Sequence, residues 1–154
     1  MKISLYNRQR ALPARPAAFK RLARKLARRA FPTEAGPPPA ELTVLLVDDA
    51  AMPAYKEQCF GERAQTDVVA QAYAEVPGVS PATAELVINA ERALIEGRRR
   101  AGGPARELAL YLAHGLHHLA GATDDTPERR RAMRRKENAW LAAEADVWKD
   151  IVAP

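Results

Sequence analysis

The chain alternates between short segments with a β-strand pattern and longer segments with an α-helix pattern. Residues 41–47 are apolar and rich in branched side chains and end at two aspartates, which is typical of a strand buried on both faces. Residues 2–6 alternate polar and apolar, and residues 66–72 and 84–89 are further strand candidates. Helical patterns occupy residues 16–31, 50–58, 91–100, 104–119 and 127–150. We therefore expect one domain, 1–154, with an α+β (mixed α/β) fold: a roughly four-stranded mixed sheet with about five helices.

The composition is that of a globular protein and excludes several classes. Of 154 residues, 47% are hydrophobic and 28% charged, so disorder throughout is excluded. The longest apolar runs are far shorter than the roughly 18 residues of a membrane span. A single cysteine, Cys59, cannot form an internal disulfide, which favours a reducing, cytoplasmic location. No phosphate-binding loop, dinucleotide fingerprint or catalytic triad is present, so we expect no nucleotide cofactor.

Positive charge is concentrated at the N-terminal end. Residues 1–31 hold ten bases and no acid, whereas the other 123 residues hold 14 bases and 19 acids. This asymmetry favours a polyanionic partner, either RNA or an anionic membrane surface, and we prefer RNA. A membrane would require an exposed apolar face on the 16–31 helix. We predict that this helix binds the RNA backbone without reading sequence, through Lys20, Arg21, Arg24, Lys25 and Arg28.

All three histidines fall within five residues of the 104–119 helix. His114 and His118 are four residues apart, so both imidazoles project from one helical face and can bind one metal ion. Gly121 ends the helix, and the chain can then return Asp124, with Asp125 in reserve, as a third ligand. Three protein ligands leave a position for a metal-bound water, the catalytic arrangement. Pairing of His114 with His117 and simple packing of the histidines are the alternatives.

The segment His114–Asp124, HGLHHLAGATD, resembles the HGxLHLxGxDH signature of the YbeY family, bacterial metal-dependent endoribonucleases and rRNA maturation factors. Residues 44–49 (VLLVDD), 63–69 (RAQTDVV) and 84–88 (AELVI) resemble other family segments, in the family's order. The resemblance implies a zinc-dependent single-strand endoribonuclease acting in rRNA maturation and ribosome quality control, with rRNA or the small ribosomal subunit as partner. The alternative is a catalytically weak, metal-containing RNA- or ribosome-binding module.

Several positions depart from the family pattern. Asp124 stands where the family has a third histidine, and His117 stands where it has leucine. The family's functional arginine has no counterpart at the matching position near Phe60, and Arg63 is the nearest candidate for neutralising charge on the phosphate. Two basic runs, 98–100 and 129–136, flank the histidine helix. We interpret them as solvated helix surface, with a route that draws phosphate toward the metal as the alternative.

Overall fold

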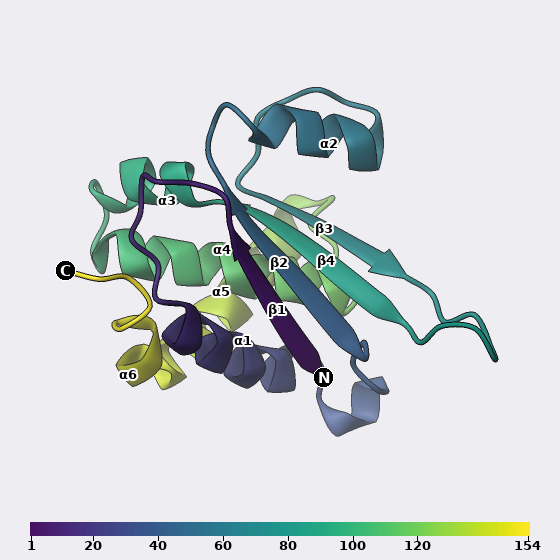
Figure 1. The fold of residues 1–154 in the computed structure, drawn as a ribbon. Coiled ribbons are helices and arrows are strands. Elements are labelled where there is room, and N and C mark those ends of the chain that lie inside the picture. Colours follow the sequence, from purple (N-terminus) through teal and green to yellow (C-terminus); the bar gives the residue numbers. More distant parts are fainter.

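The computed structural model describes residues 1–154 and consists of one sheet with helices on both faces (Figure 1). Helices α1 and α4 pack on one face, with α5 and α6 outside them, and α2 lies on the other. In chain order the elements are β1 (Lys2–Asn7), α1 (Pro16–Ala30), the 3-10 turn η1 (Thr33–Ala35), β2 (Glu41–Val47), α2 (Met52–Phe60), β3 (Val68–Tyr73), β4 (Thr83–Asn89), α3 (Ala90–Gly97), α4 (Gly103–Leu119), α5 (Pro127–Ala143) and α6 (Ala145–Trp148).

The sheet is four-stranded and mixed, as the sequence predicts. Its strand order is β1-β2-β4-β3. Strands β1, β2 and β4 are parallel, and β3 forms an antiparallel edge in which Val69 pairs with Val87. The predicted strand over 66–72 begins two residues later, at Val68. Strands β1 and β3 are therefore the two edges of the sheet.

Two apolar cores cover the two faces of the sheet. Alternate residues of the central strands, such as Val44 and Leu86, face α1 and α4 in the larger core. Their neighbours Leu45 and Val87 face α2, where Met52 is fully buried. Strands with both faces covered need no polar alternation, which explains the continuous apolar run at 44–47.

Helix α1 is amphipathic, and its apolar face is fully packed. Phe19, Leu22 and Leu26 are each 0% exposed. The exposed apolar face that a membrane-bound helix needs is therefore not available in this fold. No helix in the structure combines the length and the apolar character needed to cross a membrane.

Helix α4 lies close against the sheet because residue 115 is glycine. An added Cβ at Gly115 would sit 2.8 Å from Leu86 Cδ2 and 3.0 Å from Val68 Cγ2. Contacts this short would require the side chains of Leu86 and Val68, or α4 itself, to shift. The glycine of the histidine motif thus allows the histidine helix to lie close to the sheet.

The prediction of one helix from Thr126 to about Asp150 is wrong. The helix stops at Ala143, and α6 begins at Ala145 after a break at Glu144 (φ −110°, ψ 25°). The indole Nε1 of Trp148 donates to the Leu141 carbonyl oxygen at 2.9 Å and so satisfies an acceptor at the helix end. The structure consequently has six α-helices where about five were expected.

Candidate metal centre

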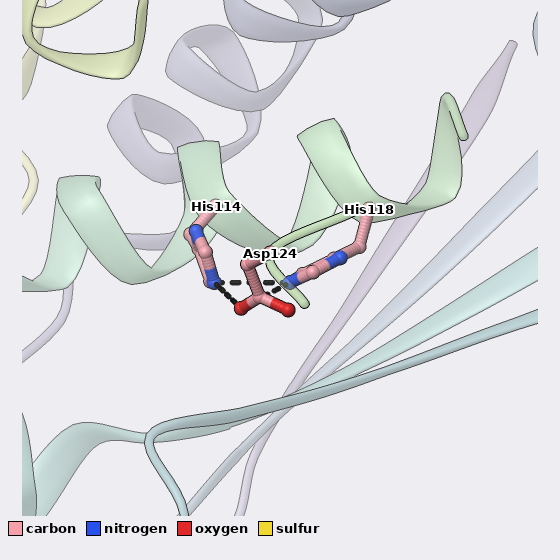
Figure 2. A group of neighbouring side chains, drawn as sticks. All are labelled: His114, His118 and Asp124. Carbon is pink, nitrogen blue, oxygen red and sulfur yellow. Dashed lines mark hydrogen bonds and ion pairs between the residues drawn. The ribbon is translucent and has the colours of Figure 1, made fainter. Parts of the chain in front are cut away.

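Three side chains meet at the C-terminal end of α4 (Figure 2). His114 and His118 project from one face of the helix, and Asp124 returns from the loop after Gly121, whose φ of 101° is left-handed. The two Nε2 atoms are 3.0 Å apart, and Asp124 Oδ2 lies 3.4 Å from His118 Nε2 and 3.7 Å from His114 Nε2. The structure thus brings together the three residues that the sequence proposes as ligands.

The hydrogen bonds of the two imidazoles fix which nitrogen faces the centre. His114 Nδ1 donates to Glu137 Oε2 at 2.9 Å, and His118 Nδ1 donates to the Ala122 carbonyl oxygen at 3.0 Å. Both partners only accept, so in the neutral rings each Nε2 is unprotonated. Two nitrogen lone pairs and the Asp124 carboxylate then converge without a hydrogen between them. Such a donor set suits a cation, which removes the repulsion of three acceptors.

The spacing also matches the size of a metal site. With bonds of about 2.0–2.2 Å, neighbouring ligand atoms of tetrahedral zinc are about 3.3–3.6 Å apart. The three separations here, 3.0, 3.4 and 3.7 Å, bracket that range. The side chains of His114, His118 and Asp124 are 25%, 29% and 44% exposed, so the open side faces solvent. The residues present therefore fit a metal ion that keeps one position for a small molecule.

Glu137 of α5 is a buried carboxylate behind the candidate ligands. Its Oε2 accepts from Nδ1 of both His114 and His117, each at 2.9 Å, and its Oε1 is buried without a partner. Burial alone would raise the pKa of Glu137, but the two histidine hydrogen bonds outweigh it and the pKa lies below its ordinary value. A carboxylate bonded to the outer nitrogen of a ligating histidine fixes the ring's orientation and tautomer.

His117 does not join the three candidate ligands. It is 7% exposed, with its ring against Trp140 at a centroid separation of 4.7 Å and its Nδ1 on Glu137. Helix α5 therefore covers the His117 side chain.

Helix α5 also holds the loop that carries Asp124. Arg130 Nη1 donates to the Asp124 backbone oxygen at 3.1 Å. Asp125, the reserve ligand, points instead to Arg129, with 2.8 Å between Oδ1 and Nη1. The hydrogen bond from Arg129 lowers the pKa of Asp125. The structure therefore groups Asp124 with the histidines and pairs Asp125 with α5.

A cavity of about 490 Å³ opens beside His114. Its walls come from the start of β3, the α3–α4 turn, α4 and α5. Tyr111 is buried at its base, where burial, followed by the charges of Asp67 and Glu107, raises the pKa of Tyr111 far above its ordinary value. Arg100, Arg106 and Arg134 line the same cavity, so positive side chains surround the approach to His114.

The other predicted site residues lie elsewhere. Arg63 follows α2 and pairs with Glu57 at 3.0 Å, and α2 covers the sheet face opposite α4. Helix α1 packs over the β1 edge, where Arg24 donates to the Met1 backbone oxygen and Arg28 lines a small cavity. The candidate ligand His114 shares its cavity with Val68 of the β3 edge. The structure does not bring Arg63 or the basic face of α1 to the candidate metal centre.

Sequence reasoning missed Glu137. A usable signal existed for Glu137, because it lies four residues after Met133 and four before Leu141, both buried. An acid in the apolar stripe of an otherwise basic helix needs a buried partner. Arg130 and Arg134 lie in the basic run 129–136 that the sequence offers as a route for phosphate, but only the packing of α5 on α4 shows which arginines of the run lie near the histidines.

Comparison with known proteins identifies the family. The family model described as "Endoribonuclease YbeY" matches residues 4–144. An endoribonuclease YbeY of Anaeromyxobacter sp. (strain Fw109-5) is 35% identical over 135 residues, covering 88% of this chain and 69% of its own length. One of Moorella thermoacetica is 30% identical over 152 residues, covering 92% and 96%. A solution structure from Thermotoga maritima shares the fold, with a TM-score of 0.58, 18% identity and coverage of 96% and 95%. The chain belongs to the YbeY family of endoribonucleases, as its histidine motif predicts.

Proposed function

We propose that this protein is a zinc-dependent endoribonuclease that cleaves single-stranded RNA in rRNA maturation and ribosome quality control in the cytoplasm. The observation that carries the proposal is the convergence of His114 Nε2, His118 Nε2 and Asp124 Oδ2, while Nδ1 of each ring is bonded to an acceptor. A set of two imidazole nitrogens and one carboxylate oxygen suits zinc. Family membership supports RNA as the substrate.

The roles of the protein side chains follow from their contacts. When bound, a zinc ion supplies Lewis-acid activation of water and of a phosphate oxygen. His114, His118 and Asp124 would hold that ion, and Glu137 keeps the His114 ring turned so that Nε2 faces it. The exposed side of the group leaves a phosphodiester free to approach from solvent.

Basic side chains bind the RNA in this proposal. Lys20, Arg21, Arg24, Lys25 and Arg28 on α1 bind the backbone of the RNA, with segments of rRNA in the small ribosomal subunit as targets. Arg63 pairs with Glu57 on the sheet face opposite α4, so it neutralises phosphate charge only on RNA that also reaches that face. No base-specific contact is needed for either role.

The test combines metal content with cleavage. Purified protein should hold about one zinc per chain, as for three protein ligands around a single ion. The loaded protein should cut a single-stranded RNA, and His114→Ala should not. Product ends report the nucleophile: a 5′-phosphate with a 3′-hydroxyl indicates attack by water, whereas a 2′,3′-cyclic phosphate indicates attack by the RNA's own 2′-hydroxyl. Cleavage by the wild type that does not exceed cleavage by His114→Ala contradicts the proposal.

A second function is favoured by one residue. Asp124 stands at the position of a family histidine, and an anionic ligand donates more charge than imidazole, so a bound metal is a weaker Lewis acid. In that case the protein is a metal-containing RNA- or ribosome-binding module with little cleavage. Stoichiometric zinc and RNA binding without cleavage above the His114→Ala control would select this function.

A further inference from the structure

Helix α5 presents arginines at regular intervals beside the candidate metal centre. Arg130, Arg134 and Asn138 are four residues apart, and each step advances about 6 Å along the helix axis. Arg130 donates to the backbone oxygen of Asp124, and Arg134 lines the cavity that contains His114. Asn138 accepts from Arg106 of α4 at 3.2 Å and so holds a third guanidinium at the next step. Three guanidinium groups thus lead away from the metal centre in a row.

The charges in this row are largely free. Arg134 is exposed and has no acidic partner in the chain, and Arg106 is bonded only to the neutral amide of Asn138. The third arginine of the cavity, Arg100, is neutralised by buried Glu107 at 2.6 Å. Asp67 is the remaining acid on the cavity wall. An anion entering beside His114 therefore meets two uncompensated guanidinium groups and one carboxylate.

We infer that the cavity between α4, α5 and β3 binds consecutive phosphates of a single RNA strand, with Arg134 and Arg106 as its phosphate-binding residues. The inference rests on the proposed function, because it takes the polyanion to be the strand that reaches the metal centre. An extended strand offers one phosphate per nucleotide at an interval similar to a turn of helix, which suits side chains four residues apart. Arginine is suited to this task because its planar fork binds phosphate oxygens in pairs.

The test compares two neighbouring arginines on the same helix. Arg134 lines the cavity, whereas Arg135 is also exposed and without an acidic partner but does not line it. Binding of a short fluorescein-labelled single-stranded RNA to the zinc-loaded protein is followed by anisotropy over a range of KCl concentrations. RNA recovered from the cuvette is run on a gel to verify that it is intact. Thermal unfolding confirms that the variants fold, as expected for exposed positions.

We expect Arg134→Ala to weaken RNA binding by about fivefold and Arg135→Ala by less than about twofold, since only the first removes a charge positioned toward the strand. The slope of log affinity against log salt should fall by about 0.7 for Arg134→Ala and by about twice that for the double variant Arg106→Ala/Arg134→Ala. Arg134→Lys should retain most of the slope because it keeps the charge.

Equal weakening of RNA binding in Arg134→Ala and Arg135→Ala would overturn the inference in favour of diffuse surface charge. If inorganic phosphate displaces the RNA more than KCl of equal ionic strength does, the ligand of the cavity is a free anion and not an RNA strand. The two proposals fail separately: cleavage without any dependence of binding on Arg134 keeps the function and removes this site. Binding that depends on Arg134, with no cleavage, keeps the site and removes the nuclease.

Discussion

Helices α1 and α5 are equally rich in basic residues but stand in different relations to the candidate metal centre. Each contains six Lys and Arg residues. Helix α1 packs on α4 and on β1, but its outer charges meet Glu144 and the chain's N-terminus and not the candidate ligands. Helix α5 packs on the histidine helix, where Glu137 contacts His114 and Arg130 contacts the Asp124 loop. Charge density alone does not show which helix serves the site; the side-chain contacts with the candidate ligands do.

The difference has a physical basis in the acids. Helix α1 has no acid, so its charge stands out in the sequence, and it has no carboxylate to offer to a histidine. Helix α5 has a lower net charge, but one of its acids is completely buried and bonded to two imidazoles. We therefore expect α5 variants to change the metal site and its use of RNA, and α1 variants to change only the affinity for RNA.

Variants of the proposed ligands should have the largest effect on zinc content and cleavage. The effects of α1 and α5 variants can be compared with it. His118→Ala removes one of the three proposed metal ligands, and we expect zinc to fall well below one per chain and cleavage to fall at least ~100-fold. His117→Ala, on the preceding residue, removes a side chain that faces Glu137 and should retain zinc. Elemental analysis after dialysis checks both. Loss of zinc from His117→Ala but not from His118→Ala would show that the ligand pair is three residues apart instead of four.

The next largest effect tests the special position of α5. Glu137→Gln keeps the size of the side chain but removes the charge that both imidazoles share, so zinc affinity should fall ~10- to 100-fold. The free energy of unfolding should fall by about 1–3 kcal/mol, because the amide NH2 of the glutamine is buried without an acceptor. Competition with a chromophoric chelator and urea unfolding measure the two quantities.

Glu144→Gln is the matched control for Glu137→Gln. Glu144 caps the same helix, but it accepts from Arg29 of α1 at 3.0 Å instead of from a histidine. Its replacement should leave zinc affinity unchanged and cost at most about 1 kcal/mol, as for other ion pairs at the surface. If the two variants lose zinc equally, the contrast between the helices does not hold.

The sequence predicts those elements and site residues whose positions depend on local patterns along the chain. The strand at 41–47 and the helices around Leu22 and Leu112 were predicted because periodicity reports which side of an element is buried. The grouping of His114, His118 and Asp124 was also predictable, because helix spacing and a stop at Gly121 bring them together within eleven residues. Glu137 reaches the site only through the packing of α5 on α4, which no local pattern specifies.

The end of α5 shows the same limit on a smaller scale. Residues 140–148 keep a helical spacing of apolar side chains, so continuation to Asp150 was the natural prediction. Two contacts accompany the break at Glu144: Arg29 of α1 bonds the Glu144 carboxylate, and the Trp148 indole donates to the Leu141 carbonyl oxygen seven residues earlier. Neither partner is visible from periodicity, which treats each helix alone.

A smaller effect is expected from α1. Reversing Arg21, Arg24 and Arg28 to Glu should weaken RNA binding several-fold at low salt and reduce the salt slope by about 0.7 for each phosphate that α1 no longer neutralises. These side chains are exposed, so the fold should tolerate the change. Zinc content and the cleavage rate at saturating RNA should match the wild type. An unchanged affinity would remove α1 from the binding surface, and a lower rate at saturation would place it at the site.

The smallest effect concerns Tyr111, at the base of the cavity that α5 borders. The raised pKa of Tyr111 means that the folded protein keeps the phenol proton when the unfolded chain, with an ordinary pKa of about 10, releases it. The stabilisation is complete below pH ~10 and is lost as pH rises above that value, because only the unfolded state gains from ionisation. Tyr111→Phe should therefore lower the free energy of unfolding by about 1 kcal/mol at neutral pH, the worth of one hydrogen bond. As pH rises into the alkaline range, the free energy of unfolding should fall less steeply for the variant than for the wild type. Urea unfolding at several pH values between neutral and strongly alkaline measures the two slopes. Parallel slopes would show that Tyr111 ionises in the folded state, and that the cavity beside α5 is open to water at its base.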